Sequence, residues 1–62
     1  MRSLTEEELQ KIRVQEDLLQ GNINRMCVTK SLSELDNMAF YARKRIETIQ
    51  SINHKRFKEE DK

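Results

Sequence analysis

The apolar residues of this chain recur at alternating intervals of three and four positions, and this spacing constrains the fold more than any other feature. Alternating intervals of this kind place side chains on one face of an α-helix. Two such series are present, and each predicts one amphipathic helix. The first series is Leu9, Ile12, Leu19, Ile23 and Met26, with Glu16 as its polar member, and the second is Leu32, Leu35, Ala39, Ala42, Ile46 and Ile49, ending at Asn53.

Two capping signals mark where these helices begin. In "LTEEEL", Thr5 can accept the backbone N–H of Glu8 while the Glu8 carboxylate accepts the N–H of Thr5, which is a capping box. "SLSE" repeats the pattern with Ser31 and Glu34. We therefore expect a single helical-hairpin domain over residues 1–62. Its parts are a first helix at about 5–28, a turn at about 28–31, a second helix at about 31–58 and a frayed tail at 59–62.

Gly21 is the single glycine of a chain that has no proline. The apolar series keeps the same phase before and after this residue, whereas a turn would reset it. A glycine inside a helix costs about 1 kcal/mol relative to alanine, which a packed helix tolerates. The first helix is therefore predicted to continue through Gly21.

Folding the chain at the turn makes the two apolar stripes face each other along their whole length. The pairs run from Met26 with Leu32, next to the turn, to Leu9 with Ile49 at the far end. The predicted fold is all-α, an antiparallel two-helix hairpin resembling a coiled coil. Two helices can bury only about ten modest side chains between them, which stabilise a hairpin only weakly. We therefore expect assembly into a four-helix homodimer, docking on another protein, or both. The predicted hairpin seam is Leu9, Ile12, Leu19, Ile23, Met26, Leu32, Leu35, Ala39, Ala42, Ile46 and Ile49.

Four further apolar residues lie outside this seam and form a candidate binding surface. Val14 and Leu18 are one helical turn apart, and the pairing places Phe40 and Tyr41 at the height of Leu18. Such a group is typical of a contact patch, although the same residues could also wrap around the edges of the seam. The predicted partner-binding residues are Val14, Leu18, Phe40 and Tyr41, with Arg43 and Lys44 at the rim.

The charges are distributed unevenly along the chain. Residues 1–20 carry three basic and five acidic groups, whereas residues 37–62 carry seven basic and four acidic groups. The segments "ARKRIE" and "NHKRFK" could contact phosphates, so nucleic-acid binding through the second helix is one alternative function. An antiparallel hairpin, however, lays the acidic segment beside the basic one. This arrangement explains the pattern without a nucleic acid, and we favour a protein partner.

The reactive side chains indicate no catalysis. Cys27 is the one cysteine, which predicts a reducing, cytoplasmic setting and a small buried side chain. His54 is expected in solvent, and the two do not form a metal site. Glu16 is expected to pair with Arg43 or Arg45, and Asn53 to set the register or to mark the fraying end of the seam. We expect no enzyme activity, no cofactor and no metal. The absence of a long apolar run predicts no membrane segment and no signal peptide.

One short motif resembles a known family. "SELD", Ser33 to Asp36, is similar to the Ser-Gln-Glu-Leu-Asp signature of the small two-helix aspartyl-phosphate phosphatases of sporulating bacteria. The chain departs from that signature, because Leu32 and Ser33 stand where the family has serine and glutamine. The resemblance implies that Glu34 and Asp36 approach the phosphoaspartate of a response regulator.

Taken from the residues, the expected function is that of a small non-catalytic protein–protein interaction module. It would act as a regulator, inhibitor or adaptor through an apolar helical face. Nucleic-acid binding by the second helix and, more weakly, phosphatase action on a response regulator are the alternatives.

Overall fold

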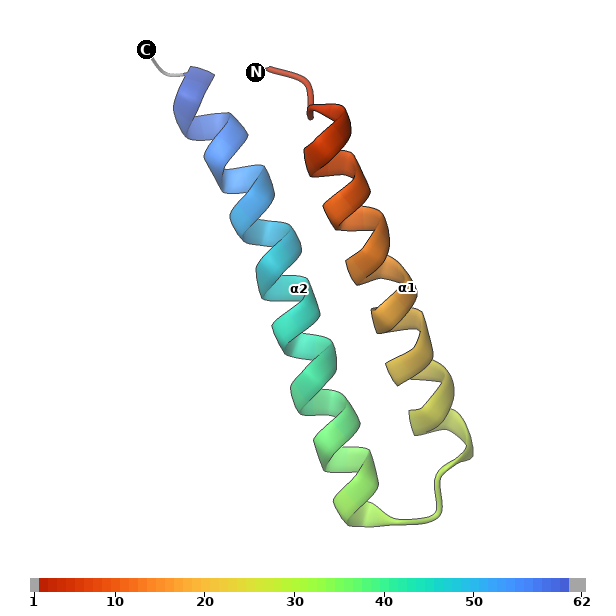
Figure 1. The fold of residues 1–62 in the computed structure, drawn as a ribbon. Coiled ribbons are helices and arrows are strands. Elements are labelled where there is room, and N and C mark those ends of the chain that lie inside the picture. The colour runs from red at the N-terminus through yellow and green to blue at the C-terminus, as the bar shows by residue number, and fades with distance from the viewer. Residues whose placement is uncertain (1, 61–62) are drawn as a thin grey trace.

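The computed structural model describes residues 2–60, with side chains to residue 58, and shows two α-helices packed against each other as an antiparallel hairpin (Figure 1). Helix α1 spans Glu6–Val28 and helix α2 spans Leu32–Glu60. The molecule is a rod with extents of 49 × 18 × 12 Å. The predicted all-helical hairpin is confirmed. Of the tail expected at 59–62, residues 61–62 lie outside the described part of the chain, and α2 continues to Glu60.

The start of α1 is fixed by the expected capping box. The N–H of Glu8 donates to Thr5 Oγ1 at 3.1 Å, and the N–H of Thr5 donates to Glu8 Oε1 at 3.0 Å. The Arg2 guanidinium adds two hydrogen bonds to the same carboxylate, at 2.8 and 2.9 Å. The Arg2 hydrogen bond, followed by that from the Thr5 backbone, lowers the pKa of Glu8 from 4.5 to about 2. Arg56 Nη1 donates to the Arg2 carbonyl at 3.2 Å and so ties the end of α2 to the start of the chain.

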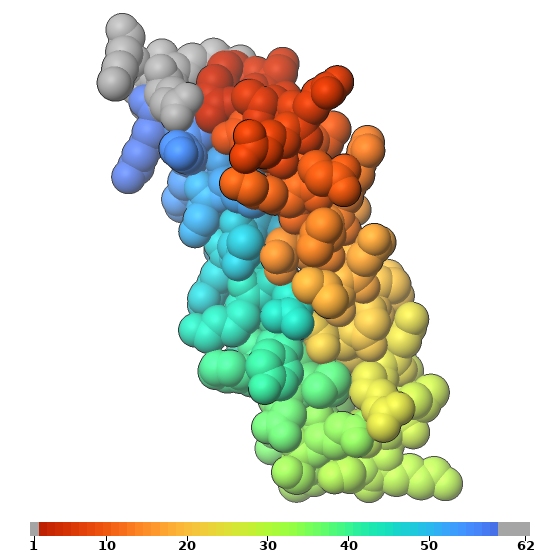
Figure 2. Space-filling view, in the orientation of Figure 1, coloured from red at the N-terminus to blue at the C-terminus, as the bar shows by residue number. Residues whose placement is uncertain are grey.

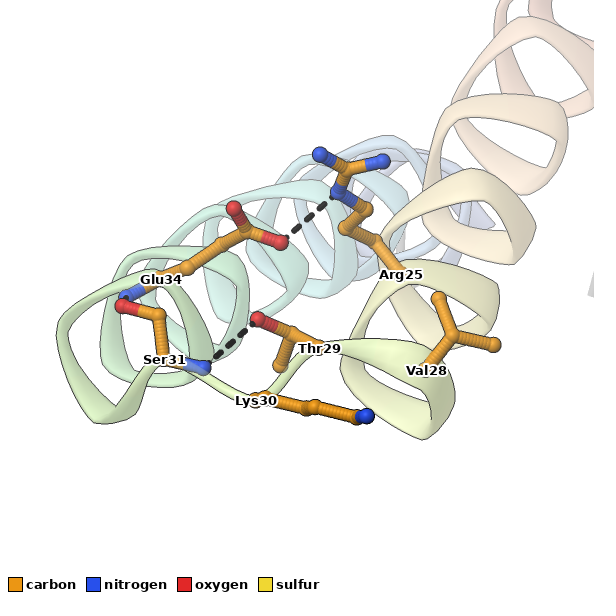
Figure 3. Close-up of a pocket in the computed structure, with 6 residues that line it drawn as sticks. All are labelled: Arg25, Val28, Thr29, Lys30, Ser31 and Glu34. Carbon is orange, nitrogen blue, oxygen red and sulfur yellow. Dashed lines mark hydrogen bonds and ion pairs between the residues drawn. The ribbon is translucent and has the colours of Figure 1, made fainter.

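The start of α2 has only half of the second expected capping box. Ser31 caps the helix, because the N–H of Glu34 donates to Ser31 Oγ at 3.3 Å. The Glu34 carboxylate does not complete the box; it accepts a hydrogen bond from Arg25 Nε of α1 at 2.7 Å (Figure 3). The Ser31 N–H donates instead to Thr29 Oγ1 at 3.2 Å. The hydrogen bond between the guanidinium and the carboxylate is charge-assisted, and it holds Glu34 across the turn.

Gly21 lies inside α1, as predicted. Its φ is not positive, and a Cβ added at this position would have no atom within 4 Å. The helix therefore continues through Gly21 without a turn or a close backbone contact that would require glycine.

The contact between the helices, which we call the seam, is rotated relative to the predicted one. Among the described side chains only Ile12 and Ala42 are buried, at 6% and 8% exposure. Four further predicted positions are half-buried: Leu19, Met26, Ala39 and Ile49. The remaining five are exposed: Leu9, Ile23, Leu32, Leu35 and Ile46. The half-buried positions that replace them include Glu8, Gln15 and Asn22 on α1 and Met38, Arg45 and Ile52 on α2.

The width of the two apolar stripes explains the rotation of the seam. Two helices touch along a narrow line, so neither stripe fits entirely between them. Long side chains such as Gln15 and Arg45 lie at the contact, where their apolar stems can cover surface, and Arg45 Nε is buried there without a hydrogen-bond partner among the described residues. One contact near the turn also departs from the expected pairing. The expected pairing puts Asn22 opposite Asp36, whereas Asn22 Nδ2 lies 3.4 Å from Met38 Sδ.

Candidate interaction surfaces

The rotated seam leaves two outward surfaces on the hairpin. Because each residue of an α-helix turns about 100° around the axis, residues next to a seam position point to one side of the pair or the other. In an antiparallel pair, the residues that directly follow seam positions in either helix share one side. The residues that directly precede seam positions share the opposite side. Figure 2 shows the side chains of α1 and α2 meeting along the rod without a deep cleft in that view.

The first surface, which we call the aliphatic face, lies on the side of the residues that follow seam positions. Its apolar members, 37–44% exposed, are Leu9, Ile23 and Ile46. Glu16 follows Gln15 and so lies in the middle of this face. Within the described part of the chain Glu16 makes no ion pair, so its expected pairing with Arg43 or Arg45 is not found. The aliphatic face therefore combines exposed apolar side chains with one unpaired carboxylate.

The second surface, the aromatic face, lies on the opposite side and contains the four apolar residues expected to bind a partner. Val14, Leu18 and Tyr41 each precede a half-buried or buried residue, and Phe40, two residues from both Met38 and Ala42, points away from the seam. All four are about half exposed. The Phe40 and Tyr41 rings contact each other edge to face, with centroids 5.7 Å apart and planes at 76°. This is a favourable aromatic geometry, which fixes both rings while leaving half of each in solvent.

Two cations lie beside these rings. Lys44 Nζ is 5.3 Å from the centre of the Phe40 ring, and the Arg45 guanidinium carbon is 5.7 Å from that of Tyr41. Arg43, predicted at the rim of this surface, follows Ala42 and lies on the side of the aliphatic face instead. The predicted set missed Arg45. The spacing of four residues between each ring and its cation was the signal that could have found it.

The turn contains an open hollow, which is lined by Arg25, Val28, Thr29, Lys30, Ser31 and Glu34 (Figure 3). Two of its charged groups bind each other, since Arg25 holds Glu34 at 2.7 Å. The hydrogen bonds from Arg25 and then from Thr29 lower the pKa of Glu34. Asp36, the other acidic residue of the "SELD" motif, is exposed on α2. The hollow thus consists of capping and ion-pairing groups that fix the turn.

The expected environments of Cys27, His54 and Asn53 can be compared with the structure. Cys27 is exposed, so its expected burial is wrong, because the rotation of α1 turns it away from the seam. His54 is exposed, as expected. Asn53 is half-buried, and its side chain bonds within α2, donating to the Ile49 carbonyl and accepting from Arg56 Nε, both at 3.0 Å. Among the described residues no three His, Cys, Asp or Glu side chains gather where they could hold a metal ion.

Neither α1 nor α2 contains a stretch long and apolar enough to cross a membrane. The aliphatic and aromatic faces lie on the outside of a two-helix rod. No protein-family model, no curated protein sequence and no solved structure matches the chain.

Proposed function

We propose that this protein is a non-catalytic protein-interaction module, acting as a regulator, inhibitor or adaptor, and that it binds its partner through the aromatic face. One observation carries the proposal: Phe40 and Tyr41 pack edge to face and remain about half exposed, and Leu18 is similarly exposed on α1. Exposed aromatic side chains held in a fixed geometry are typical of the residues that dominate binding energy at protein interfaces. Fixing them beforehand also lowers the entropy cost of binding.

The cations beside the rings define the chemistry of the partner. Lys44 and Arg45 place positive charge next to the apolar centre of the aromatic face. A complementary partner presents an apolar groove that accepts the Phe40 ring, with acidic side chains at its rim. Charges at the rim of an interface act mainly on the association rate and on specificity.

The distribution of the cations favours a protein over a nucleic acid. Arg2, Arg25 and Lys44 each lie within 4 Å of a carboxylate, at 2.8, 2.7 and 3.7 Å. Arg43 and Lys44 point to opposite sides of the hairpin. A nucleic-acid surface needs a stripe of unpaired cations on one side, which this arrangement does not favour. The phosphatase alternative is also not favoured, because Glu34 is held by Arg25.

The test compares two phenylalanines of similar exposure. Phe40 is 50% exposed on the aromatic face, and Phe57 is 45% exposed near the end of α2 with Arg56 over its ring at 5.0 Å. A partner is first isolated from cell extract with the wild-type protein, and its affinity is then measured with purified components. We expect Phe40→Ala to weaken binding by about 30-fold, equivalent to about 2 kcal/mol, and Phe57→Ala to leave it within about twofold. Equal affinity of wild type, Phe40→Ala and Leu18→Ala would refute the proposal.

A further inference from the structure

We propose that the aliphatic face binds a second copy of this chain. In the resulting four-helix dimer both turns lie at the same end, and α1 of each copy packs over α2 of the other. This dimer goes beyond the proposed function, because it uses the side of the hairpin opposite to the aromatic face. The inference rests on the exposed area of the hairpin, on the residues of the aliphatic face and on their charges.

The hairpin exposes more surface than a compact monomer of its mass. Its accessible surface is 4996 Å². A compact monomer of 7.5 kDa exposes about 4,250 Å² by the usual relation between mass and surface. The difference of about 750 Å² is close to the roughly 800 Å² that each partner buries in a standard interface. One further hairpin stacked on this one is thus enough to bring the exposed surface to a normal value.

The aliphatic face is the part of the hairpin best suited to that role. Leu9 and Ile23 on α1, and Ile46 on α2, belong to the regular apolar stripes that the seam leaves uncovered. They lie on both helices, so a flat stack of two hairpins covers all three. The alternating intervals of three and four residues are those of helices that pack on two neighbours in a four-helix bundle.

Two symmetric arrangements would bury this face against itself. In one, the two-fold axis is parallel to the helices, the turns lie at the same end, and α1 packs over α2 of the other copy. In the other, the axis is perpendicular to the helices, the turns lie at opposite ends, and α1 packs over its own equivalent. The two arrangements bury the same apolar side chains, so charge must decide between them.

Glu16 decides between the two arrangements. Since Asn22 contacts Met38, counting six residues along each antiparallel helix places Glu16 level with Lys44. Arg43 is at the same level and points to the side of the aliphatic face. Turns at the same end therefore bring Glu16 next to Arg43 of the second copy. Turns at opposite ends bring the two Glu16 carboxylates together at the middle of the face, where they repel each other.

The charges of whole segments agree with this choice. Residues 1–20 carry five acidic and three basic groups, and residues 37–62 carry seven basic and four acidic groups. Packing α1 over α2 of the second copy places the acidic segment of each copy against the basic segment of the other, and complementary charges across an interface favour this arrangement.

The first test measures the mass in solution by sedimentation equilibrium. We expect about 15 kDa, twice the 7.5 kDa of one chain. Ile46 on the aliphatic face and Leu18 on the aromatic face are both 44% exposed, which makes them a matched pair. Ile46→Lys should weaken self-association at least about tenfold, and Leu18→Lys should leave it unchanged. A wild-type mass of one chain at millimolar concentration, or dissociation by Leu18→Lys alone, would overturn the proposal.

The second test uses the charge pair and does not depend on a core substitution. Glu16→Arg and Arg43→Glu should each weaken self-association, because each variant faces like charges across both symmetric sites. Mixing the two variants should restore a dimer made of one copy of each, since every Arg then faces a Glu. A failure of the mixture to associate would contradict the pairing of Glu16 with Arg43 between copies. An ion pair within one chain cannot produce this rescue.

The third test reads the direction of the two hairpins from Cys27, which is exposed and is the one cysteine. Turns at the same end put the two Cys27 residues at the same level on diagonally opposite helices, whose axes are about 14 Å apart when neighbouring axes are about 10 Å apart. Turns at opposite ends put them about 33 Å apart. Cys27 lies eleven residues from Glu16, which is about 16.5 Å along the helix at 1.5 Å per residue, and the two copies are displaced in opposite directions. A spin label on Cys27 distinguishes the two arrangements by the distance that pulsed electron paramagnetic resonance measures. The double variant Cys27→Ser/Ser33→Cys moves the label to the exposed position 33 and repeats the measurement there. The long distance would overturn the arrangement.

Failure of this inference and failure of the proposed function give different results. Ile46→Lys should lose the dimer and keep binding of the partner described above, whereas Leu18→Lys should keep the dimer and lose that partner. A monomeric wild type that still binds the partner through Phe40 overturns the dimer alone. A dimer whose partner binding ignores Phe40 and Leu18 overturns the proposed function alone.

Discussion

Replacing Gly21 by alanine is expected to stabilise the hairpin. Gly21 lies in the interior of α1, has no positive φ, and offers open space to an added Cβ, with no atom within 4 Å. The substitution therefore introduces no clash and no backbone strain. It also reduces the conformational freedom that the unfolded chain loses on folding.

The expected gain is about 0.5–1 kcal/mol, the usual difference between alanine and glycine inside a helix. For a domain of 62 residues this corresponds to an increase in Tm of roughly 2–8 °C. Thermal and urea unfolding followed by circular dichroism measure it. Protein concentration must be fixed, because self-association makes Tm depend on concentration.

Gln20→Ala is the matched control, since the residue is exposed, lies next to Gly21 and is already a good helix former. It should change the free energy of unfolding by no more than about 0.5 kcal/mol. A clear loss of stability in Gly21→Ala would refute the reasoning. It would mean that the chain turns or kinks at Gly21, and the continuous α1 on which both faces depend would not exist.

Two other substitutions test the cap and the seam. The pKa of Glu8 is lowered from 4.5 to about 2, so its stabilisation is complete above pH 4.5 and disappears as the pH falls towards 2. Glu8→Gln should therefore have a lower free energy of unfolding than wild type at pH 7. Between pH 4.5 and 2 its free energy of unfolding should fall less than that of wild type or of the exposed control Glu6→Gln. Urea unfolding at each pH measures both differences. Ile12→Ala should cost about 2 kcal/mol or more because Ile12 is only 6% exposed, whereas Val14→Ala on the aromatic face should cost less than about 1 kcal/mol in the same assay. Equal losses at the two positions would contradict the seam described above.

The fold could be predicted from the sequence because its signals are local. The Thr5–Glu8 capping box and the unbroken phase through Gly21 depend on residues within a few turns of each other, and the structure contains both. Two apolar stripes separated by a cap leave a hairpin as the simplest way to bury them. These signals establish that two helices form and face each other.

The rotation of the seam could not be predicted in the same way. The stripe that includes Leu9 and Ile23 and the narrower set that includes Gln15 and Asn22 share Ile12, Leu19 and Met26, so spacing alone does not separate them. The choice depends on how long side chains such as Arg45 pack across the pair, which hydrophobicity does not describe. The same rotation moves Arg43 away from the aromatic face and turns Cys27 into solvent.

The ion pair at the turn was also beyond local reasoning. Glu34 has an ordinary capping role at the start of α2, and nothing within its own helix indicates a competitor. Arg25 comes from the last turn of α1 and reaches Glu34 only because the turn is three residues long. Local spacing correctly predicts the cap at Ser31, but the partner of the Glu34 carboxylate depends on a contact between α1 and α2.

The central claim is that this hairpin recognises a protein through apolar contact at Phe40, and the salt dependence of that binding tests it most directly. The measurement is the Kd of the purified partner for wild type and Phe40→Ala at 50 and 200 mM salt. We expect the wild-type Kd to change less than about tenfold between the two conditions, and Phe40→Ala to be about 30-fold weaker in both. A loss of about 10³-fold or more with salt, together with an unchanged Kd for Phe40→Ala, would contradict the account and indicate binding through phosphate contacts.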